Sequence, residues 1–156
     1  MGLGSQVLLA LDFEQTYWRT FLSNATLFDE VKELLDDIRL LGIPTAIVTD
    51  LTAQIQFRKL VYFGLDEFFD YVVTSEEAGA DKPDSRPFNV ALEKLQLKPE
   101  NIWMIGDSAS NDMVGAHRAG MYKIQKVHSG VKVKTSPEAI PDIVFKKYSE
   151  LFKYFK

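Results

Sequence analysis

Residues 102–112 have the sequence Ile-Trp-Met-Ile-Gly-Asp-Ser-Ala-Ser-Asn-Asp, in which an apolar run is followed by Gly106, Asp107 and, a little further on, Asp112. The apolar run predicts a buried strand. Because the C-terminal ends of parallel strands face the ligand crevice of an open α/β sheet, the two carboxylates are well placed for ligand binding. Paired carboxylate oxygens suit a hard divalent cation such as Mg²⁺. An aspartate that only caps the next helix is the structural alternative for either residue alone.

Length and composition are those of an ordinary globular domain. The chain has 156 residues, of which 46% are hydrophobic and 26% charged, so we expect one domain over residues 1–156. Its net charge of −4 argues against nucleic acid or an anionic membrane surface as a partner. The absence of cysteine excludes disulfides and thiolate chemistry. No apolar run approaches membrane-spanning length and residues 1–6 lack the features of a signal peptide, so we expect a cytoplasmic protein.

Strand and helix patterns alternate along the chain, which predicts βαβ units and a parallel sheet covered on both faces. The expected fold is therefore an α/β three-layer sandwich with a Rossmann-like sheet. No G-x-G-x-x-G follows any expected strand, which argues against dinucleotide binding. Helices are expected at 26–41 (with a capping box at its start), 53–62, 87–97, 110–119 and 148–155, and strands at 43–49, 71–74, 102–105, 122–127 and 142–145, the last two as edge strands.

Polar residues follow several of the expected strands. Thr49 and Asp50 end the strand at 43–49, and Lys82 lies in the loop after the strand at 71–74. A threonine hydroxyl can donate to a phosphoryl oxygen, a lysine can neutralise its charge, and the carboxylates Asp107 and Asp112 can hold a cation against the same anion. Taken singly, Thr49 has the alternative role of a helix cap and Lys82 that of an exposed loop residue.

In the order of these residues the chain resembles the haloacid dehalogenase-like (HAD) hydrolase superfamily. Ile47-Val48-Thr49-Asp50 is similar to its second motif, Lys82-Pro83 to its third, and Ile105-Gly106-Asp107 through Asp112 to its fourth. The similarity covers residues 27–127, about two thirds of the chain.

The resemblance implies a magnesium-dependent phosphate-monoester phosphatase that acts through an aspartyl-phosphate. By position, Thr49 and Lys82 are implied to be catalytic residues that bind the phosphoryl group. Asp50 is a further candidate for substrate binding, although its position has no firm role of its own in the family. Asp107 and Asp112 are implied to support the Mg²⁺ cofactor.

The first motif of the family is an apolar strand that ends in Asp-x-Asp, usually followed by Gly-Thr. The candidate here is Val7-Leu8-Leu9-Ala10-Leu11-Asp12-Phe13-Glu14-Gln15-Thr16. The resemblance then makes Asp12 the nucleophile and a third metal ligand, and Glu14 the general acid and base. Two departures, Glu14 in place of aspartate and Gln15 in place of glycine, put full activity in question.

A second interpretation of this segment is a helix. Leu and Ala favour helix, and apolar residues from Leu8 to Ala25 keep roughly helical spacing. Residues 17–21 are then similar to the last helix of a cap domain, and the chain is a truncated or catalytically inactive relative that retains a phosphate- and metal-binding scaffold. Against this, the first-motif strand of the family is central, and its omission leaves two neighbouring strands without a ladder partner. The two interpretations remain open here.

The spacing of the motifs leaves no room for a full cap domain. Between Asp12 and Thr49 there is space for one helix and a loop, and between Thr49 and Lys82 for one helix and a strand. Caps exclude water from such sites. An open site accommodates a bulky phosphate as well as a phosphorylated small molecule, and a second subunit of a homo-oligomer is a further candidate for the lid.

Overall fold

The computed structural model describes residues 3–155, so that Met1 and Gly2, the first two residues of the segment 1–6 that lacks signal-peptide features, lie outside the described part. The strands within it are all parallel and form two separate sheets, one of two strands and one of three. An α/β fold with parallel strands is thus confirmed. The first sheet pairs β1 (Ala46–Thr49) with β2 (Tyr71–Thr74), and the second has the order β3 (Trp103–Gly106), β4 (Tyr122–Lys126), β5 (Ile143–Phe145).

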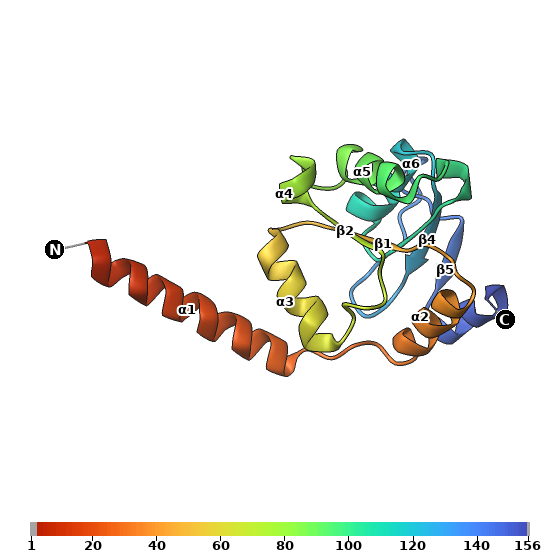
Figure 1. Ribbon diagram of the computed structural model, residues 1–156. Helices are drawn as coiled ribbons and strands as arrows, with labels where there is room; N and C mark the ends of the chain where they lie inside the picture. The colour runs from red at the N-terminus through yellow and green to blue at the C-terminus, as the bar shows by residue number, and fades with distance from the viewer. Residues whose placement is uncertain (1–2, 156) are drawn as a thin grey trace.

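Helices follow most strands, as the alternating pattern predicts, and they lie on both faces of the strands (Figure 1). The helical turn after β3 is π-helical over Ala109–Met113 before it continues as an α-helix. The helices are α1 (Leu3–Asn24), α2 (Val31–Leu40), α3 (Ala53–Phe63), α4 (Ser75–Ala78), α5 (Arg86–Leu95) and α6 (Val114–Arg118), with the short helices η1 (Pro99–Asn101), η2 (Ala109–Met113) and η3 (Tyr148–Tyr154).

Two apolar clusters form the core, one on each side of the larger sheet. Leu34 of α2 packs with Ile124 of β4 and Leu151 of η3 on one side. On the other side Phe88 of α5 packs with Ala116 of α6, so closely that a Cβ on Gly115 would overlap the Phe88 ring. Helix, sheet and helix therefore form three layers around β3 and β4.

Several expected boundaries are wrong. The helix expected from Thr26 begins only at Val31, because Glu30 before it adopts a left-handed backbone (φ 67°) that interrupts the helical path. The strand expected from Ile43 begins at Ala46, because the N–H of Thr45 donates to the Asp70 carboxylate (2.7 Å). The Thr45 N–H therefore bonds to a side chain and not to a neighbouring strand.

The expectation that residues 122–127 form an edge strand is also wrong. β4 pairs with β3 on one side and with β5 on the other. Ile124, Gln125 and Lys126 are correspondingly buried. Burial on this scale is what a strand with two neighbours and two covered faces shows.

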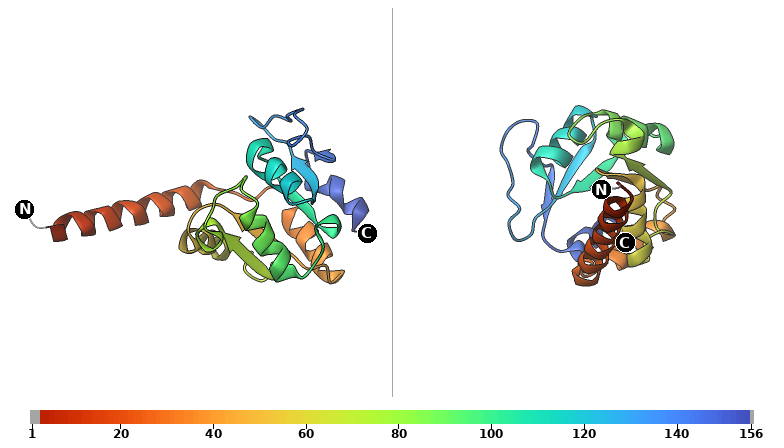
Figure 2. Two further views of the ribbon diagram at one scale, coloured as in Figure 1. Left: turned by 90° about the horizontal axis from the view of Figure 1, so that it is seen from above. Right: turned by 90° about the vertical axis from the view of Figure 1, so that its left-hand side faces the viewer.

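Residues 3–24 form one helix, so the prediction of a strand at residues 7–11 is wrong and the helical alternative is confirmed. Figures 1 and 2 show α1 extending away from the rest of the chain, with its first residues farthest from the sheets. Leu22 near its end is buried, whereas Val7, Leu8 and Phe13 are each more than half exposed. No helix within residues 3–155 is long and apolar enough to cross a lipid bilayer.

The two sheets are separate because residues 3–24 form a helix and not a strand that pairs with both. β1 pairs only with β2, and β3 pairs only with β4, so each has one edge without a strand partner among the described residues. The segment expected to lie between them is helical and projects outward. Within residues 3–155, no strand therefore pairs with both β1 and β3.

Candidate functional site

Lys82 joins the C-terminal ends of the two sheets. Its ammonium group donates to the backbone carbonyl of Val48 in β1 (2.9 Å) and to the Asp112 carboxylate beyond β3 (2.8 Å). Both charged side chains are nearly buried, with 12% of Lys82 and 7% of Asp112 exposed. Its backbone N–H donates to the Asp50 carboxylate (2.9 Å), which attaches the loop to the end of β1. The structure thus brings together Lys82, Asp50 and Asp112, which are far apart in sequence.

The π-helical turn positions Asp112. The backbone N–H of Met113 reaches back to the Ser108 carbonyl (3.1 Å), which widens the turn, and the Ser108 N–H donates to the second Asp112 oxygen (3.0 Å). A Cβ on Gly106 would overlap the Asp112 carboxylate, so this close approach requires glycine at the end of β3. Gly106, which precedes Asp107, therefore allows the Asp112 carboxylate to lie close to the end of β3.

Thr49 is the last residue of β1 and is half-buried. Its hydroxyl lies 3.3 Å from the Asp50 carbonyl, a long hydrogen bond within the turn. Thr49 thus stands at the same C-terminal edge as Val48, whose carbonyl contacts the Lys82 ammonium group. A hydroxyl donor and an ammonium donor at one strand end suit an anion such as a phosphoryl group.

Asp107 follows β3 at the same edge but is more exposed. Its carboxylate lies 3.1 Å from Nε2 of His128, and its backbone carbonyl accepts a bond from the Gln125 side chain (3.0 Å). Neither neighbour was predicted from the sequence motifs. The available signal was topological, since Gln125 pairs in register with Gly106 and the residues after β4 must therefore lie beside Asp107.

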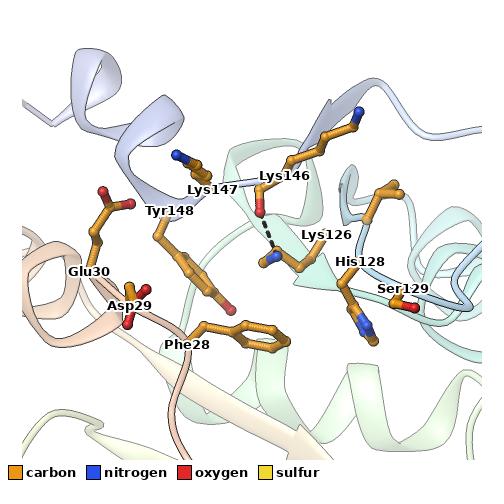
Figure 3. A pocket seen from close by; sticks show the side chains of 10 residues that line it. Phe28, Asp29, Glu30, Lys126, His128, Ser129, Lys146, Lys147 and Tyr148 are labelled. Carbon is orange, nitrogen blue, oxygen red and sulfur yellow. Dashed lines mark hydrogen bonds between the residues drawn. The ribbon is translucent and has the colours of Figure 1, made fainter.

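A cavity of about 670 Å³ opens beside His128, between the C-terminal ends of β4 and β5 and the segment before α2 (Figure 3). Phe28 and Tyr148 form part of its wall, and the Lys126 ammonium group lies 4.3 Å from the centre of the Phe28 ring. Burial, together with the negative charge of Asp107, raises the pKa of the Tyr148 hydroxyl. Aromatic side chains thus line part of the cavity, which lies next to Asp107 at the C-terminal end of β3.

The two first-motif candidates lie apart from this group. Asp12 is exposed on α1, and Glu14 forms an ion pair with Arg58 of α3 (3.4 Å). Among residues 3–155, no three His, Asp or Glu side chains are grouped so that they could hold a metal ion. Asp107 and Asp112 supply two carboxylates, one of which is bound to Lys82, so these residues alone do not complete a Mg²⁺ site.

The chain is similar in sequence and in fold to several known proteins. Residues 8–126 match the family model described as haloacid dehalogenase-like hydrolase. The chain is 37% identical over 112 residues to a ribulose-1,5-bisphosphate 5-phosphatase from Halopiger xanaduensis, covering 72% of this chain and 47% of that protein. It is 35% identical over 126 residues to a phosphoserine phosphatase from Thermus thermophilus, covering 81% and 50%.

Among solved structures, the magnesium-bound HAD-hydrolase YfnB from Bacillus subtilis superposes with a TM-score of 0.77 at 29% identity, over 92% of this chain and 62% of that one. The chain spans about half the length of the two phosphatases above. The family match covers most of this chain, from α1 to the end of β4. The chain therefore belongs to the haloacid dehalogenase-like hydrolases.

Proposed function

We propose that this chain carries the phosphate-binding part of a HAD-like phosphatase that acts on phosphorylated small molecules. The observation that carries the proposal is the Lys82 ammonium group, held nearly buried at the ends of both sheets. The relatives named as a ribulose-1,5-bisphosphate 5-phosphatase and a phosphoserine phosphatase support a phosphate monoester as the substrate class.

Lys82 and Thr49 are the proposed ligands of the phosphoryl group. An ammonium group has three N–H donors. Two of those of Lys82 bind Val48 and Asp112, which leaves one without a partner among the described residues. Within the described part of the chain, the Thr49 hydroxyl has only a long bond to the Asp50 carbonyl and can turn toward an anion. Together they offer two donors to one phosphoryl group.

Asp107 and Asp112 are the proposed carboxylates of the cation site. A divalent cation supplies positive charge that stabilises a phosphoryl group during transfer. Asp107 and Asp112 follow β3, whereas Asp12 lies on α1, so we expect firm Mg²⁺ binding only when a third oxygen ligand joins the first two.

A second candidate function, a scaffold that binds phosphate without hydrolysing it, is favoured by the helical conformation of residues 3–24. A nucleophile must lie within reach of the phosphorus atom. Asp12 instead lies exposed on α1, which extends away from the rest of the chain (Figure 1). We therefore expect the 156-residue chain on its own to bind phosphate through Thr49 and Lys82 without Asp12-dependent turnover.

Titration of the purified chain with inorganic phosphate, followed by calorimetry, tests the proposal. The substitution Thr49→Val keeps the side-chain shape and removes the hydroxyl, so affinity should fall about tenfold, the worth of one hydrogen bond to a charged group. Asp12→Asn is the matched control and should leave affinity unchanged. Absence of phosphate binding by the folded chain, or equal affinity of the Thr49→Val variant, contradicts the proposal.

A further inference from the structure

We infer that the cavity shown in Figure 3 is a subsite for a carboxylate on the organic part of a phosphate-monoester substrate, with Lys126 and Tyr148 as the donors. The inference rests on the proposed function and deepens it, because it names a second charged group that the substrate carries. Three features support it: the unpaired charge of Lys126, the free hydroxyl of Tyr148 and the position of the cavity next to Asp107.

Lys126 carries a nearly buried positive charge that has no negative partner. Only 5% of the residue is exposed. Its ammonium group donates to the backbone carbonyl of Lys146 (2.6 Å) and forms no ion pair with a carboxylate within residues 3–155. Its other neighbours are ring faces, with the centre of Phe28 at 4.3 Å and that of Tyr148 at 5.7 Å. One carbonyl and aromatic faces offset only part of the cost of burying a charge, so an anion placed here is stabilised more than at an exposed lysine.

The Tyr148 hydroxyl is a second donor in the same cavity. It has no hydrogen-bond partner among the described residues, and Figure 3 shows it directed inward, toward Phe28. Burial and the negative charge of Asp107 raise the pKa of this hydroxyl, so it keeps its proton at neutral pH. A carboxylate has two oxygen acceptors. One can accept from Lys126 and the other from Tyr148.

A row of rings connects the cavity to the strand end that holds the proposed cation site. The Tyr148 ring contacts the Phe28 ring (6.2 Å between centres), and Phe28 contacts the ring of His128 (5.4 Å). Nε2 of His128 lies 3.1 Å from the Asp107 carboxylate. The wall of the cavity therefore runs from Tyr148 to Asp107, and the carbon chain of a substrate can pack along it.

The distance between the two cationic groups indicates the length of the substrate. Lys82 contacts the end of β1 and the Asp112 carboxylate beyond β3, whereas Lys126 ends β4, the strand that pairs with β3 on its other side. Neighbouring strands lie about 4.8 Å apart, so the two ammonium groups are separated by roughly 10 Å, or two strand spacings. We therefore expect the carboxylate and the phosphoryl group at opposite ends of a carbon chain as long as that of a sugar.

The charges around the cavity favour an anion over a cation. Lys146 and Lys147 add positive charge at its exposed rim. Of the two carboxylates that line it, Glu30 already accepts a bond from a backbone N–H (2.8 Å), and Asp29 is exposed to solvent. A positively charged ligand would meet the unpaired ammonium group of Lys126. The inner part of the cavity thus selects a negatively charged group.

Calorimetric titration with two matched ligands tests the inference. 6-Phosphogluconate and sorbitol 6-phosphate share their carbon chain and phosphate, and differ in having a carboxylate or a hydroxymethyl group at the far end. We expect the chain to bind 6-phosphogluconate at least tenfold more tightly, the worth of one hydrogen bond to a charged group. Lys126→Met keeps the length of the side chain, and Tyr148→Phe removes only the hydroxyl. Each should abolish the preference while affinity for sorbitol 6-phosphate stays unchanged, which a purely structural role of these residues would not produce.

Lys153→Met is the matched control, because Lys153 also lies over an aromatic ring, that of Tyr154 (5.0 Å), but outside the cavity. It should leave the preference intact. Amide hydrogen exchange locates the site: residues 126–129 and 146–148 should be slowed more by 6-phosphogluconate than by sorbitol 6-phosphate, and residues 71–74 of β2 equally by both.

Equal affinities for the two ligands, or a preference that persists in the Lys126→Met and Tyr148→Phe variants, overturns the inference. The titration with inorganic phosphate separates this failure from that of the proposed function. Phosphate binding that depends on Thr49, combined with equal affinities for the two ligands, would overturn the carboxylate subsite alone. Absence of phosphate binding contradicts the proposed function itself.

Discussion

Asp112→Ala should destabilise the folded chain by about 3–5 kcal/mol, because it leaves a nearly buried ammonium group without its carboxylate. The Lys82–Asp112 pair is 2.8 Å long, with 12% and 7% of the two side chains exposed. The Ser108 N–H loses its acceptor as well. The remaining partner of the ammonium group, the Val48 carbonyl, carries no compensating charge.

The free energy of unfolding, measured by urea denaturation at neutral pH, provides the assay. The matched control is Asp36→Ala, which removes an ion pair to Arg39 of similar length (3.1 Å) whose side chains are 49% and 55% exposed. That loss should be about 0.5 kcal/mol or less. The double substitution Asp112→Ala with Lys82→Met should recover most of the loss, because no charge then remains buried. A loss for Asp112→Ala as small as that of the control would refute the reasoning.

Three further predictions concern packing and ionisation. Gly115→Ala should lower the unfolding free energy by about 1–3 kcal/mol in the same urea assay, because the added methyl group overlaps the Phe88 ring; an unchanged midpoint would contradict the described packing. The pKa of Tyr148 is raised by burial, so its stabilising contribution is present below the ordinary tyrosine pKa and lost at higher pH. Titration of tyrosinate absorbance should show a late-ionising component that Tyr148→Phe removes. The pKa of Glu30 is lowered by hydrogen bonds from Ser149, so its contribution is present above the ordinary glutamate pKa and lost as the pH falls. Glu30→Gln should therefore make the acid dependence of the unfolding midpoint shallower, and an identical dependence would count against this bond.

The strand-end residues of the second, third and fourth motifs could be predicted from sequence because each depends on local signals. β2 has the predicted bounds, and β3 ends at Gly106, one residue after the expected end, so Asp107 and Asp112 still follow its C-terminal end. The proximity of Lys82 to Asp112 then follows from the parallel direction of the strands. The contacts of Asp107 with His128 and Gln125 could not be predicted in this way, because they depend on which strand neighbours β3.

The first segment could not be decided from sequence, because its residues satisfy two patterns at once. The run from Val7 to Leu11 is apolar enough for a buried strand, and its leucine and alanine content also favours helix. A buried strand depends on partners on both sides, whereas a helix satisfies its own backbone. Val7 and Leu8 are exposed on α1, so the helix forms here without burial of these side chains.

The central claim, that this chain binds phosphate at Lys82 but does not carry its nucleophile on Asp12, is tested most directly by magnesium-dependent hydrolysis of an aryl phosphate. The chain and its Asp12→Asn variant are assayed side by side. The account predicts no magnesium-dependent turnover that distinguishes the two proteins, because Asp12 lies on an outward helix. Turnover by the chain that the Asp12→Asn substitution abolishes would contradict it, and would place residues 7–12 between β1 and β3.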